Sequence, residues 1–211
     1  IAQVILMSHL LAGATVILGG RFDPEHAAAR IKQTGATRTS LVPTQLVRWL
    51  DHLQDRDPRL GRLQAIYVGG SRIPPTVFER ALTCLGPRIG VLYGMTEAPV
   101  TCYLPPQCLD IDVEKRRLLM QSVGHELFGY HMRIATADGP TAAADTAGEV
   151  LIRGGNITAG YWEQEAASRA LLRDGWLHTG DIGQLDDAGN LYLVGRLNDI
   201  IRSGSSTVMP K

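Results

Sequence analysis

Asp181 and Arg196, two oppositely charged residues, have the spacing of partners across a β-hairpin. The runs IGQLD and NLYLVG flank the turn-rich DDAGN, and both residues are nearly equidistant from that turn. We therefore expect their side chains to meet at the open end of the hairpin. A carboxylate can accept hydrogen bonds from a vicinal diol such as ribose, and a guanidinium can bind the same sugar or a phosphate. The alternative is an exposed ion pair that stabilises the fold by under about 1 kcal/mol.

Two glycine-marked loops could bind a nucleotide. The apolar run AIYV leads into GGS at residues 69–71, and IGVL leads into YGMTE at residues 93–97. Glycines let a flat or anionic ligand approach the backbone, while Thr96 offers a hydroxyl group and Glu97 a carboxylate suited to Mg²⁺. The alternative is that GGS is an ordinary turn and that Thr96 caps a helix.

Other candidate residues give weaker signals. His178 has no acidic or nucleophilic partner at a recognisable spacing, so we expect a surface or half-buried residue and not a catalytic base. Ser71 lacks the glycine frame of a nucleophile elbow. Neither GGNITAG, residues 154–160, nor SGSS, residues 203–206, fits a dinucleotide or P-loop fingerprint.

The first half of the chain alternates strand and helix signals. Strands are expected at residues 15–18, 38–42, 64–68 and 89–92, and helices at residues 22–35, 43–53 and 74–86. The first of these helices has Asp23 as its cap, Pro24 in its first turn and Gly35 as its end. Such alternation indicates an α/β fold with a parallel sheet and flanking helices. Ligands bind beyond the carboxyl ends of such strands, where the two glycine-marked loops are placed.

The second half is predicted to be mostly β. Residues 101–122 give a weak signal and are treated as a connection, within which DVEKRRLLMQ could form a helix. Short strands separated by Asp, Gly and Asn clusters are then expected at residues 132–136, 148–154, 182–186 and 190–195. One helix, at residues 163–175, interrupts them.

Composition narrows the class of partner. The 21 Lys and Arg residues balance the 21 Asp and Glu residues, so no net field attracts nucleic acid or an anionic membrane. The longest apolar run, broken by Ser8, His9 and Gly13, is too short to span a bilayer. Three cysteines without paired spacing fit free thiols in a reducing compartment. We expect a cytoplasmic protein without stable membrane insertion.

Four stretches together resemble one enzyme superfamily. YGMTE, GEVLIRGGNITAGYW, DGWLHTGD and GRLNDIIRSG occur in the order and approximate spacing of adenylate-forming (AMP-binding) enzymes, which include acyl-CoA ligases, nonribosomal-peptide adenylation domains and luciferases. FDPEHAAARIKQTGATRTSLVPT and VGGSRI are similar to the acyl-CoA ligase branch, which includes fatty-acid-CoA synthetases. The resemblance covers nearly the whole chain. It implies part of a large N-terminal domain, in which an α/β subdomain precedes a small antiparallel, β-barrel-like subdomain.

The resemblance also implies the division of the chain. A partial α/β subdomain with the adenine and phosphate loops would occupy residues 1–120. A mostly β subdomain with the ribose-binding hairpin would occupy residues 121–197. Residues 198–211 would form a hinge and the start of a C-terminal domain, with Asn198 at the hinge position where relatives more often have Asp or Lys.

Most of the singled-out residues are implied to bind ATP or AMP. The nucleotide-binding set is Gly69, Gly70, Ser71, Tyr93, Gly94, Met95, Thr96, Asp181 and Arg196. Residues 69–71 would border the adenine, where family members usually have GGAPL or SGAAP. Thr96 would bind the phosphate, and Asp181 would hold the ribose hydroxyls with the help of Arg196. Thr96 and Glu97 are the implied catalytic residues, and Glu97 would hold Mg²⁺.

The remaining site residues are implied to contact the base or the acyl group. Tyr93 would stack near the adenine, and Gly94 and Met95 would line both the nucleotide and the acyl pocket. The acyl chain would be bordered by Ala98, Pro99 and Val100.

The implied reaction is ATP-dependent activation of a carboxylic acid as an acyl-adenylate, followed by transfer to CoA. No Ser/Thr/Gly-rich phosphate loop and no C-terminal domain with its lysine occur in the sequence. We therefore expect a fragment of an AMP-forming acyl-CoA ligase with little or no turnover by itself. An adenylation domain that transfers to a carrier-protein thiol and a noncatalytic nucleotide-binding relic are the alternatives. The identity of the acid stays open, as does the choice between monomer and homodimer.

Overall fold

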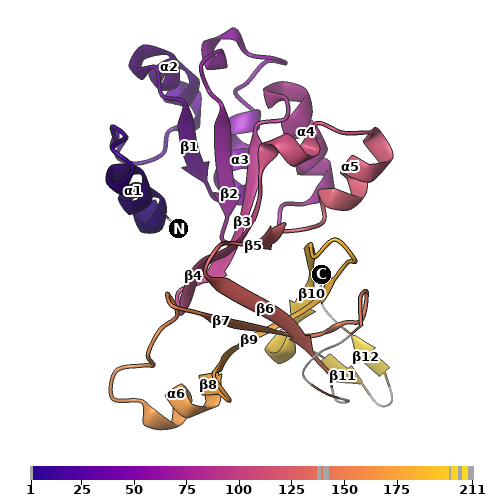
Figure 1. The fold of residues 1–211 in the computed structure, drawn as a ribbon. Coiled ribbons are helices and arrows are strands. Elements are labelled where there is room, and N and C mark those ends of the chain that lie inside the picture. Colours follow the sequence, from indigo (N-terminus) through magenta and orange to yellow (C-terminus); the bar gives the residue numbers. More distant parts are fainter. Residues whose placement is uncertain (1, 137–138, 140–142, 200, 204–205, 209–211) are drawn as a thin grey trace. The chain divides into compact units, whose positions relative to one another are not determined.

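The computed structural model describes residues 2–136, 139, 143–199, 201–203 and 206–208 (Figure 1). The chain divides into two compact units. Unit 1 comprises Ile1–Tyr93 and Leu104–Met120, and unit 2 comprises Gly94–Tyr103 and Gln121–Lys211. The expected domain boundaries at residues 120 and 197 remain a proposal. Positions 200, 204–205 and 209–211 of the expected hinge segment, and part of the SGSS stretch, lie outside the described residues.

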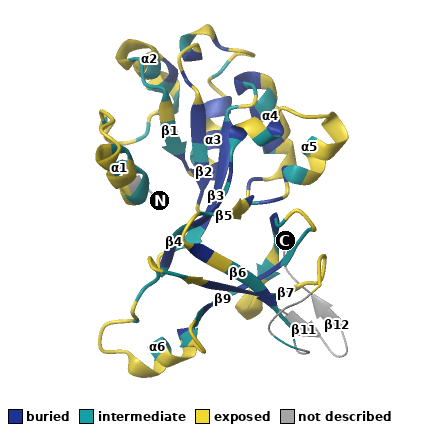
Figure 2. Cartoon of the chain, in the orientation of Figure 1, coloured by how far each residue is buried: buried dark blue, intermediate teal, exposed yellow. Residues whose placement is uncertain are grey.

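Unit 1 contains a parallel sheet, as the sequence predicts. Its strands are β1 (Arg38–Leu41), β2 (Ala65–Gly69) and β3 (Ile89–Met95), in the order β1-β2-β3. The central strand is buried along most of its length, with Ile66 and Val68 fully inaccessible to solvent (Figure 2). Near-continuous burial of this kind is typical of parallel strands.

Three of the helices of unit 1 precede or connect these strands: α2 (Pro24–Thr34) precedes β1, α3 (Pro43–Leu50) connects β1 to β2, and α4 (Pro75–Leu85) connects β2 to β3 (Figure 1). The unit also contains α1 (Ala2–Leu11), α5 (Val113–Leu119), η1 (Pro58–Leu60) and η2 (Pro106–Leu109). The predicted ends of α2 are confirmed. The Asp23 side chain accepts a hydrogen bond from the Glu25 backbone N–H, and Gly35 closes the helix with a left-handed φ of 68°.

Two expectations for the first half were wrong. Residues 15–18 form no strand, and Ile17 and Leu18 are exposed. A short run of apolar and β-branched residues was therefore not sufficient for strand formation. Part of the expected connection after residue 101 belongs to β4 (Ala98–Leu104). The strand was missed because Pro99 lies near its start and irregular residues follow it.

Unit 2 is mostly antiparallel, as expected. In it, β4 pairs with the short β5 (His125–Glu126). A second sheet has the order β10-β9-β7-β6, and β8 pairs with β9. Its strands are β6 (Tyr130–Ala135), β7 (Gly148–Gly154), β8 (Leu172–Arg173), β9 (Trp176–Leu185) and β10 (Leu191–Arg196). The unit also contains α6 (Glu165–Leu171), η3 (Leu197–Asp199), β11 (Ile201–Ser203) and β12 (Ser206–Val208).

The long strand β9 is the centre of this sheet. It pairs with β7 on one edge and with β10 on the other. The register shifts between Glu149 and Leu151 of β7, and again between Leu193 and Gly195 of β10. These irregularities lie beside the segment of β9 that contains Asp181, and such bulges commonly redirect a side chain.

Two further expectations can be compared with the structure. In the part of the chain that the structure describes, no helix has the length and apolar character needed to cross a membrane. Cys84, Cys102 and Cys108 are free thiols, and the first two are buried.

Candidate functional site

The predicted pair at the base of the β9–β10 hairpin is confirmed. Asp181 and Arg196 are in register, and Nε of Arg196 donates a hydrogen bond to Oδ1 of Asp181 at 2.8 Å. The Asp181 side chain is only 8% exposed, whereas that of Arg196 is 66% exposed. The pair is therefore asymmetric. The Asp181 carboxylate is nearly buried, whereas most of the Arg196 side chain is in contact with water.

Side-chain hydrogen bonds hold the backbone that leads into Asp181. The Asp181 N–H donates to Oγ1 of Thr179 at 3.0 Å, and the Thr179 hydroxyl donates to the Val150 carbonyl oxygen at 2.7 Å. The next N–H, of Gly180, donates to Oε1 of Glu149 at 3.1 Å. Thr179 and Glu149 thus fasten this part of β9 to β7.

His178 has an acidic partner, contrary to the expectation from sequence. Its Nδ1 lies 2.8 Å from Oε2 of Glu149. The two residues are 29 positions apart and meet only because β7 and β9 are neighbours, so local spacing could not reveal the contact. The expectation of a surface or half-buried residue is confirmed, since His178 is half-buried.

Thr96 and Glu97 form the turn between β3 and β4. The alternative that Thr96 caps a helix is wrong, because a strand follows it. Thr96 is exposed. The Glu97 carbonyl oxygen accepts a hydrogen bond from the Thr158 N–H at 2.7 Å, and Oε1 of its side chain accepts one from the Tyr161 phenol at 2.6 Å.

Tyr161 is a site residue that the sequence argument missed. It stands in the GGNITAGYW stretch, 64 residues from Glu97, and no spacing rule links the two. The hydrogen bond to Glu97 is the main cause that raises the pKa of the Tyr161 phenol above its usual range. The phenol is therefore a donor to the carboxylate throughout the neutral range.

The residues near Glu97 are compatible with Mg²⁺. Among the described residues, no group of three or more His, Cys, Asp or Glu side chains could enclose a metal ion. Mg²⁺ does not require such a cage, since it is commonly bound by one or two carboxylates together with substrate phosphates and water. Glu97 offers hard oxygen ligands, and Tyr161 supplies the kind of hydrogen bond that orients a metal-binding carboxylate.

The start of β4 is tightly packed. A Cβ atom added to Gly94 would overlap the backbone nitrogen of Val100 and lie 2.9 Å from the carbonyl oxygen of Ala98. Val100 has a φ of 46°, an unusual conformation for a β-branched residue that indicates local strain. Ala98 is fully buried beside Leu171 and Leu177, with Met95 against the same cluster, and the Pro99 carbonyl oxygen accepts a hydrogen bond from the Tyr130 hydroxyl.

In unit 1 the expected adenine loops follow neighbouring strands. Gly69 is the last residue of β2 and is in register with Leu92 of β3, directly before Tyr93. Gly70 has a φ of 96°, which a residue with a side chain would adopt only under strain. Ser71 is exposed, and Tyr93 is buried. The carboxyl end of β2 thus lies beside Leu92 of β3, which agrees with the expectation that these two strands are neighbours.

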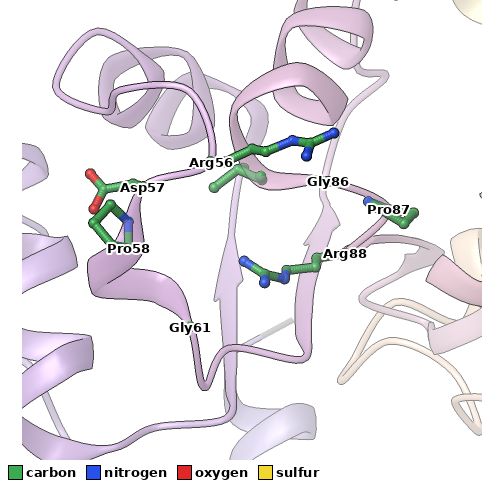
Figure 3. Close-up of a pocket in the computed structure, with 8 residues that line it drawn as sticks. Arg56, Asp57, Pro58, Gly61, Gly86, Pro87 and Arg88 are labelled. Carbon is green, nitrogen blue, oxygen red and sulfur yellow. The ribbon is translucent and has the colours of Figure 1, made fainter.

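A pocket of about 320 Å³ in unit 1 lies elsewhere (Figure 3). Its lining residues are Arg56, Asp57, Pro58, Gly61, Leu85, Gly86, Pro87 and Arg88. The last of these directly precedes β3, so the pocket lies at the amino end of that strand, whereas Tyr93 is near the carboxyl end. It contains none of the predicted site residues, and we do not assign it to the nucleotide.

Asn198 is exposed in η3, immediately after β10. Its position just beyond Arg196 agrees with the connection expected from sequence, and its role as a hinge remains a proposal.

Comparison with known proteins decides the family. The family described as AMP-binding enzyme matches residues 1–162 of the chain. The chain belongs to the AMP-binding enzyme family. This confirms the resemblance carried by YGMTE and by GEVLIRGGNITAGYW, which lie within the matched residues.

The curated relatives of this AMP-binding enzyme include CoA ligases. A 2-succinylbenzoate–CoA ligase of Bacillus cytotoxicus is 32% identical over 206 residues, which are 98% of this chain and 41% of the relative. The medium/long-chain-fatty-acid–CoA ligase FadD8 of Mycobacterium tuberculosis is 31% identical over 96% of this chain and 34% of its own length. The chain thus spans well under half the length of these relatives.

Solved structures give the same fold. The amide bond synthetase McbA of Marinactinospora thermotolerans superposes with a TM-score of 0.87 at 30% identity, over 97% of this chain and 40% of McbA. The O-succinylbenzoate CoA synthetase MenE of Bacillus subtilis, solved with ATP and magnesium ion, superposes with a TM-score of 0.84 at 30% identity, over 98% of this chain and 41% of MenE.

Proposed function

We propose that this AMP-binding enzyme activates a carboxylic acid with ATP as an acyl-adenylate and transfers the acyl group to CoA. The observation that carries the proposal is the withdrawn Asp181 carboxylate, held by Arg196 at the base of a hairpin. Support comes from the relatives, of which one acts on 2-succinylbenzoate and CoA and another on medium- and long-chain fatty acids and CoA. The MenE structure contains ATP and magnesium.

The proposed nucleotide-binding residues would contact different parts of the nucleotide. Gly69, Gly70 and Ser71 would border the adenine, with Tyr93 stacked near it. In unit 2, Asp181 would accept hydrogen bonds from the ribose hydroxyls. Charge-assisted bonds of this kind are about twice as strong as neutral ones. Arg196 is mostly exposed and could turn toward the sugar or a phosphate without leaving Asp181.

Thr96 and Glu97 would act where the reaction takes place. The substrate carboxylate attacks the α-phosphorus of ATP, the bond to the β-phosphate oxygen breaks, and pyrophosphate leaves with the electron pair. The Thr96 hydroxyl can donate to a phosphate oxygen as negative charge builds there. Glu97 would hold Mg²⁺, which when bound neutralises charge on the phosphates. In the second half-reaction, the CoA thiol loses its proton to solvent and its sulfur attacks the acyl carbon. The bond between that carbon and the AMP phosphate oxygen breaks, and AMP leaves with the electron pair.

The acyl group would lie along the β3–β4 hairpin. Gly94, Met95, Ala98, Pro99 and Val100 are the proposed lining residues. Gly94 and the positive φ of Val100 keep this backbone close-packed, so the hairpin would present a firm wall to the substrate. One relative acts on an aromatic succinyl compound and another on fatty acids. Both classes of acid should therefore be tested as substrates.

The amide bond synthetase McbA supports a second acceptor. Its fold matches this chain with a TM-score of 0.87, and its name indicates that it forms an amide. Adenylation is the step that an amide-forming and a thioester-forming enzyme could share. An amine therefore belongs among the acceptors that are tested beside CoA and a carrier-protein thiol.

The proposal is tested in two stages with the full-length protein. ATP–pyrophosphate exchange is first measured with a panel of aromatic and aliphatic carboxylic acids, and an acid that supports exchange identifies the substrate class. AMP release is then measured with that acid and CoA, an amine or a carrier protein. Absence of acid-dependent exchange across the panel would contradict adenylation, and AMP release only with an amine would reassign the acceptor.

We also propose that the 211-residue chain has little or no turnover by itself, since it spans 41% or less of the curated relatives compared above. Positioning by the remainder of such an enzyme should supply much of the rate. Acid-dependent pyrophosphate exchange by the purified chain at a rate near that of the full-length protein would contradict this.

A further inference from the structure

We propose that Glu149 is a positioning residue for the nucleotide site, because its carboxylate fixes the backbone turn from which Asp181 projects. This inference rests on the proposed function, in which Asp181 binds the ribose hydroxyls. Glu149 is the second residue of β7, and it contacts β9 through both of its carboxylate oxygens.

The two contacts of Glu149 are on either side of Thr179. Oε1 accepts a hydrogen bond from the Gly180 N–H at 3.1 Å, and Oε2 lies 2.8 Å from Nδ1 of His178. The side chains of Glu149 and His178 are 17% and 18% exposed, so water competes only weakly for these groups. Hydrogen bonds to a charged group in such a place are among the stronger ones in proteins.

Gly180 is the residue on which the direction of Asp181 depends. Its φ of 71° lies in the left-handed region, which glycine enters without a steric penalty but from which it also departs easily. Since Gly180 directly precedes Asp181, a rotation about its backbone bonds would swing the Asp181 carboxylate away from the position it shares with Arg196. The bond from Gly180 to Glu149 opposes that rotation.

Thr179 fastens the same turn from the other side. Its hydroxyl donates to the Val150 carbonyl oxygen and accepts from the Asp181 N–H. Val150 and Glu149 are adjacent in β7, at the place where the register with β9 shifts. One bulged segment of β7 therefore holds both Thr179 and Gly180, while Asp181 itself remains directed toward Arg196.

His178 can donate a hydrogen bond to Oε2 of Glu149 only when its Nδ1 carries a proton. Its Nδ1 also lies 2.7 Å from Nη2 of Arg173. One ring nitrogen cannot donate to Glu149 and accept from Arg173 at once, so the two contacts are alternatives. The contact from Glu149 to Gly180 is common to both arrangements, which makes Glu149 and not His178 the residue to test.

The test measures binding of ATP and of 2′,3′-dideoxy-ATP to the full-length protein by calorimetry. Glu149→Ala is expected to weaken ATP binding by about 5- to 10-fold, the size of one typical net hydrogen bond. Binding of the dideoxy nucleotide should be unchanged, because it lacks the hydroxyls that Asp181 would hold. Glu149→Gln is the matched control: its amide keeps an oxygen for Gly180 and should restore binding to within about twofold.

A double-mutant cycle separates positioning from a general effect on the fold. In an Asp181→Ala background, Glu149→Ala should cause no further loss of ATP affinity, since the carboxylate it positions is gone. Equal weakening of ATP and dideoxy-ATP, or additive effects in the double mutant, would overturn the role of Glu149 alone. If Asp181→Ala by itself leaves ATP affinity unchanged, the proposed ribose contact fails and the positioning role fails with it.

A second variant covers the case in which Glu149→Ala does not fold. Glu149→Asp keeps the charge but shortens the side chain by one methylene, so it cannot reach both Gly180 and His178 as Glu149 does. Its affinity for ATP should fall as in Glu149→Ala, and its affinity for the dideoxy nucleotide should be unchanged. A Glu149→Asp protein that binds both nucleotides like the wild type would overturn the proposal.

Discussion

The phenol of Tyr161 donates a 2.6 Å hydrogen bond to Oε1 of Glu97, across 64 residues of sequence. If Glu97 binds Mg²⁺, the hydrogen bond from Tyr161 orients the Glu97 carboxylate. Tyr161→Phe should then lower Mg²⁺ affinity on the order of 10-fold, which is the lower end of the loss caused by removing a hydrogen-bond partner of a metal ligand. The measurement is the Mg²⁺ concentration that gives half-maximal ATP–pyrophosphate exchange. Thermal stability should change little, since Tyr161 is a surface residue that is 38% exposed.

Tyr192→Phe is the matched control for this experiment. It also removes a hydrogen bond from a phenol to a carboxylate, that of Asp186, but the pair lies near the tip of the β9–β10 hairpin. We expect its Mg²⁺ requirement to equal that of the wild type. Equal Mg²⁺ requirements in the two variants would show that the contact between Tyr161 and Glu97 does not serve a metal.

Asp181 and Arg196 should differ in their effect on nucleotide binding. Asp181→Ala removes a carboxylate that is 8% exposed and should weaken ATP binding by roughly 1.5–3 kcal/mol, the range for hydrogen bonds to a charged group. Arg196→Ala should cost less, about 1 kcal/mol or under, because the guanidinium is mostly in water. Calorimetric titration with ATP checks both, and the reverse order of effects would contradict the assignment of the ribose to Asp181.

The pair of Asp181 and Arg196 was predictable because a hairpin is a local structure. Two alternating runs around DDAGN predict that residues 181 and 196 lie nearly opposite each other. A count from the turn does not give their exact pairing, which also depends on the register shift between Leu193 and Gly195. The ends of α2 were predictable for the same reason, since Asp23 and Gly35 act on their own backbone neighbours. The sheet in unit 1 followed from the alternation of strands and helices.

Contacts between distant side chains could not be predicted in this way. Glu149 reaches His178 and Gly180 only because β7 pairs with β9 around a helix and a short strand that separate them in sequence. Tyr161 lies in the irregular segment between β7 and α6, and the course of that segment brings its phenol to Glu97. The wrong strand at residues 15–18 has the complementary cause: β propensity indicates a surface that can pair, and nothing local specifies whether a partner strand exists.

Gly94→Ala should destabilise the β3–β4 hairpin. The added Cβ would overlap the backbone nitrogen of Val100, and backbone atoms cannot move aside as the end of a flexible side chain can. We expect a loss of at least about 1–3 kcal/mol in the free energy of unfolding, together with reduced adenylation, because the turn with Thr96 and Glu97 belongs to this hairpin. Urea denaturation followed by circular dichroism measures the first effect.

Gly155→Ala is the control for that substitution. A Cβ at Gly155 would meet no atom within 4 Å, and its backbone is not in the left-handed region. Its stability should stay within about 0.5 kcal/mol of the wild type. Similar denaturation midpoints for the two variants would mean that the hairpin can adjust to a side chain at residue 94.

The far end of the β9–β10 hairpin should respond to alkaline pH through Tyr192. Its hydroxyl donates to Oδ2 of Asp186 at 3.1 Å, and Asn190 donates to the same carboxylate through its backbone and its side chain. Burial would raise the pKa of Asp186, but the hydrogen bonds from Asn190 and Tyr192 outweigh it and lower that pKa. Burial, and then the charge of Asp186, raise the pKa of Tyr192 from 10.0 to about 12.

The folded protein therefore retains the Tyr192 proton at a pH where the unfolded chain releases it. Because the unfolded state then binds fewer protons, stability should fall as pH rises from about 10 to about 12. Below pH 10 the titration of this group should cause no change of stability with pH. Tyr192→Phe should lower stability by about 1 kcal/mol at neutral pH through loss of the hydrogen bond. It should also make the decline above pH 10 shallower. Urea unfolding at several pH values from 8 to 11.5 tests this, and parallel curves for the two proteins would exclude Tyr192 as the source of the slope.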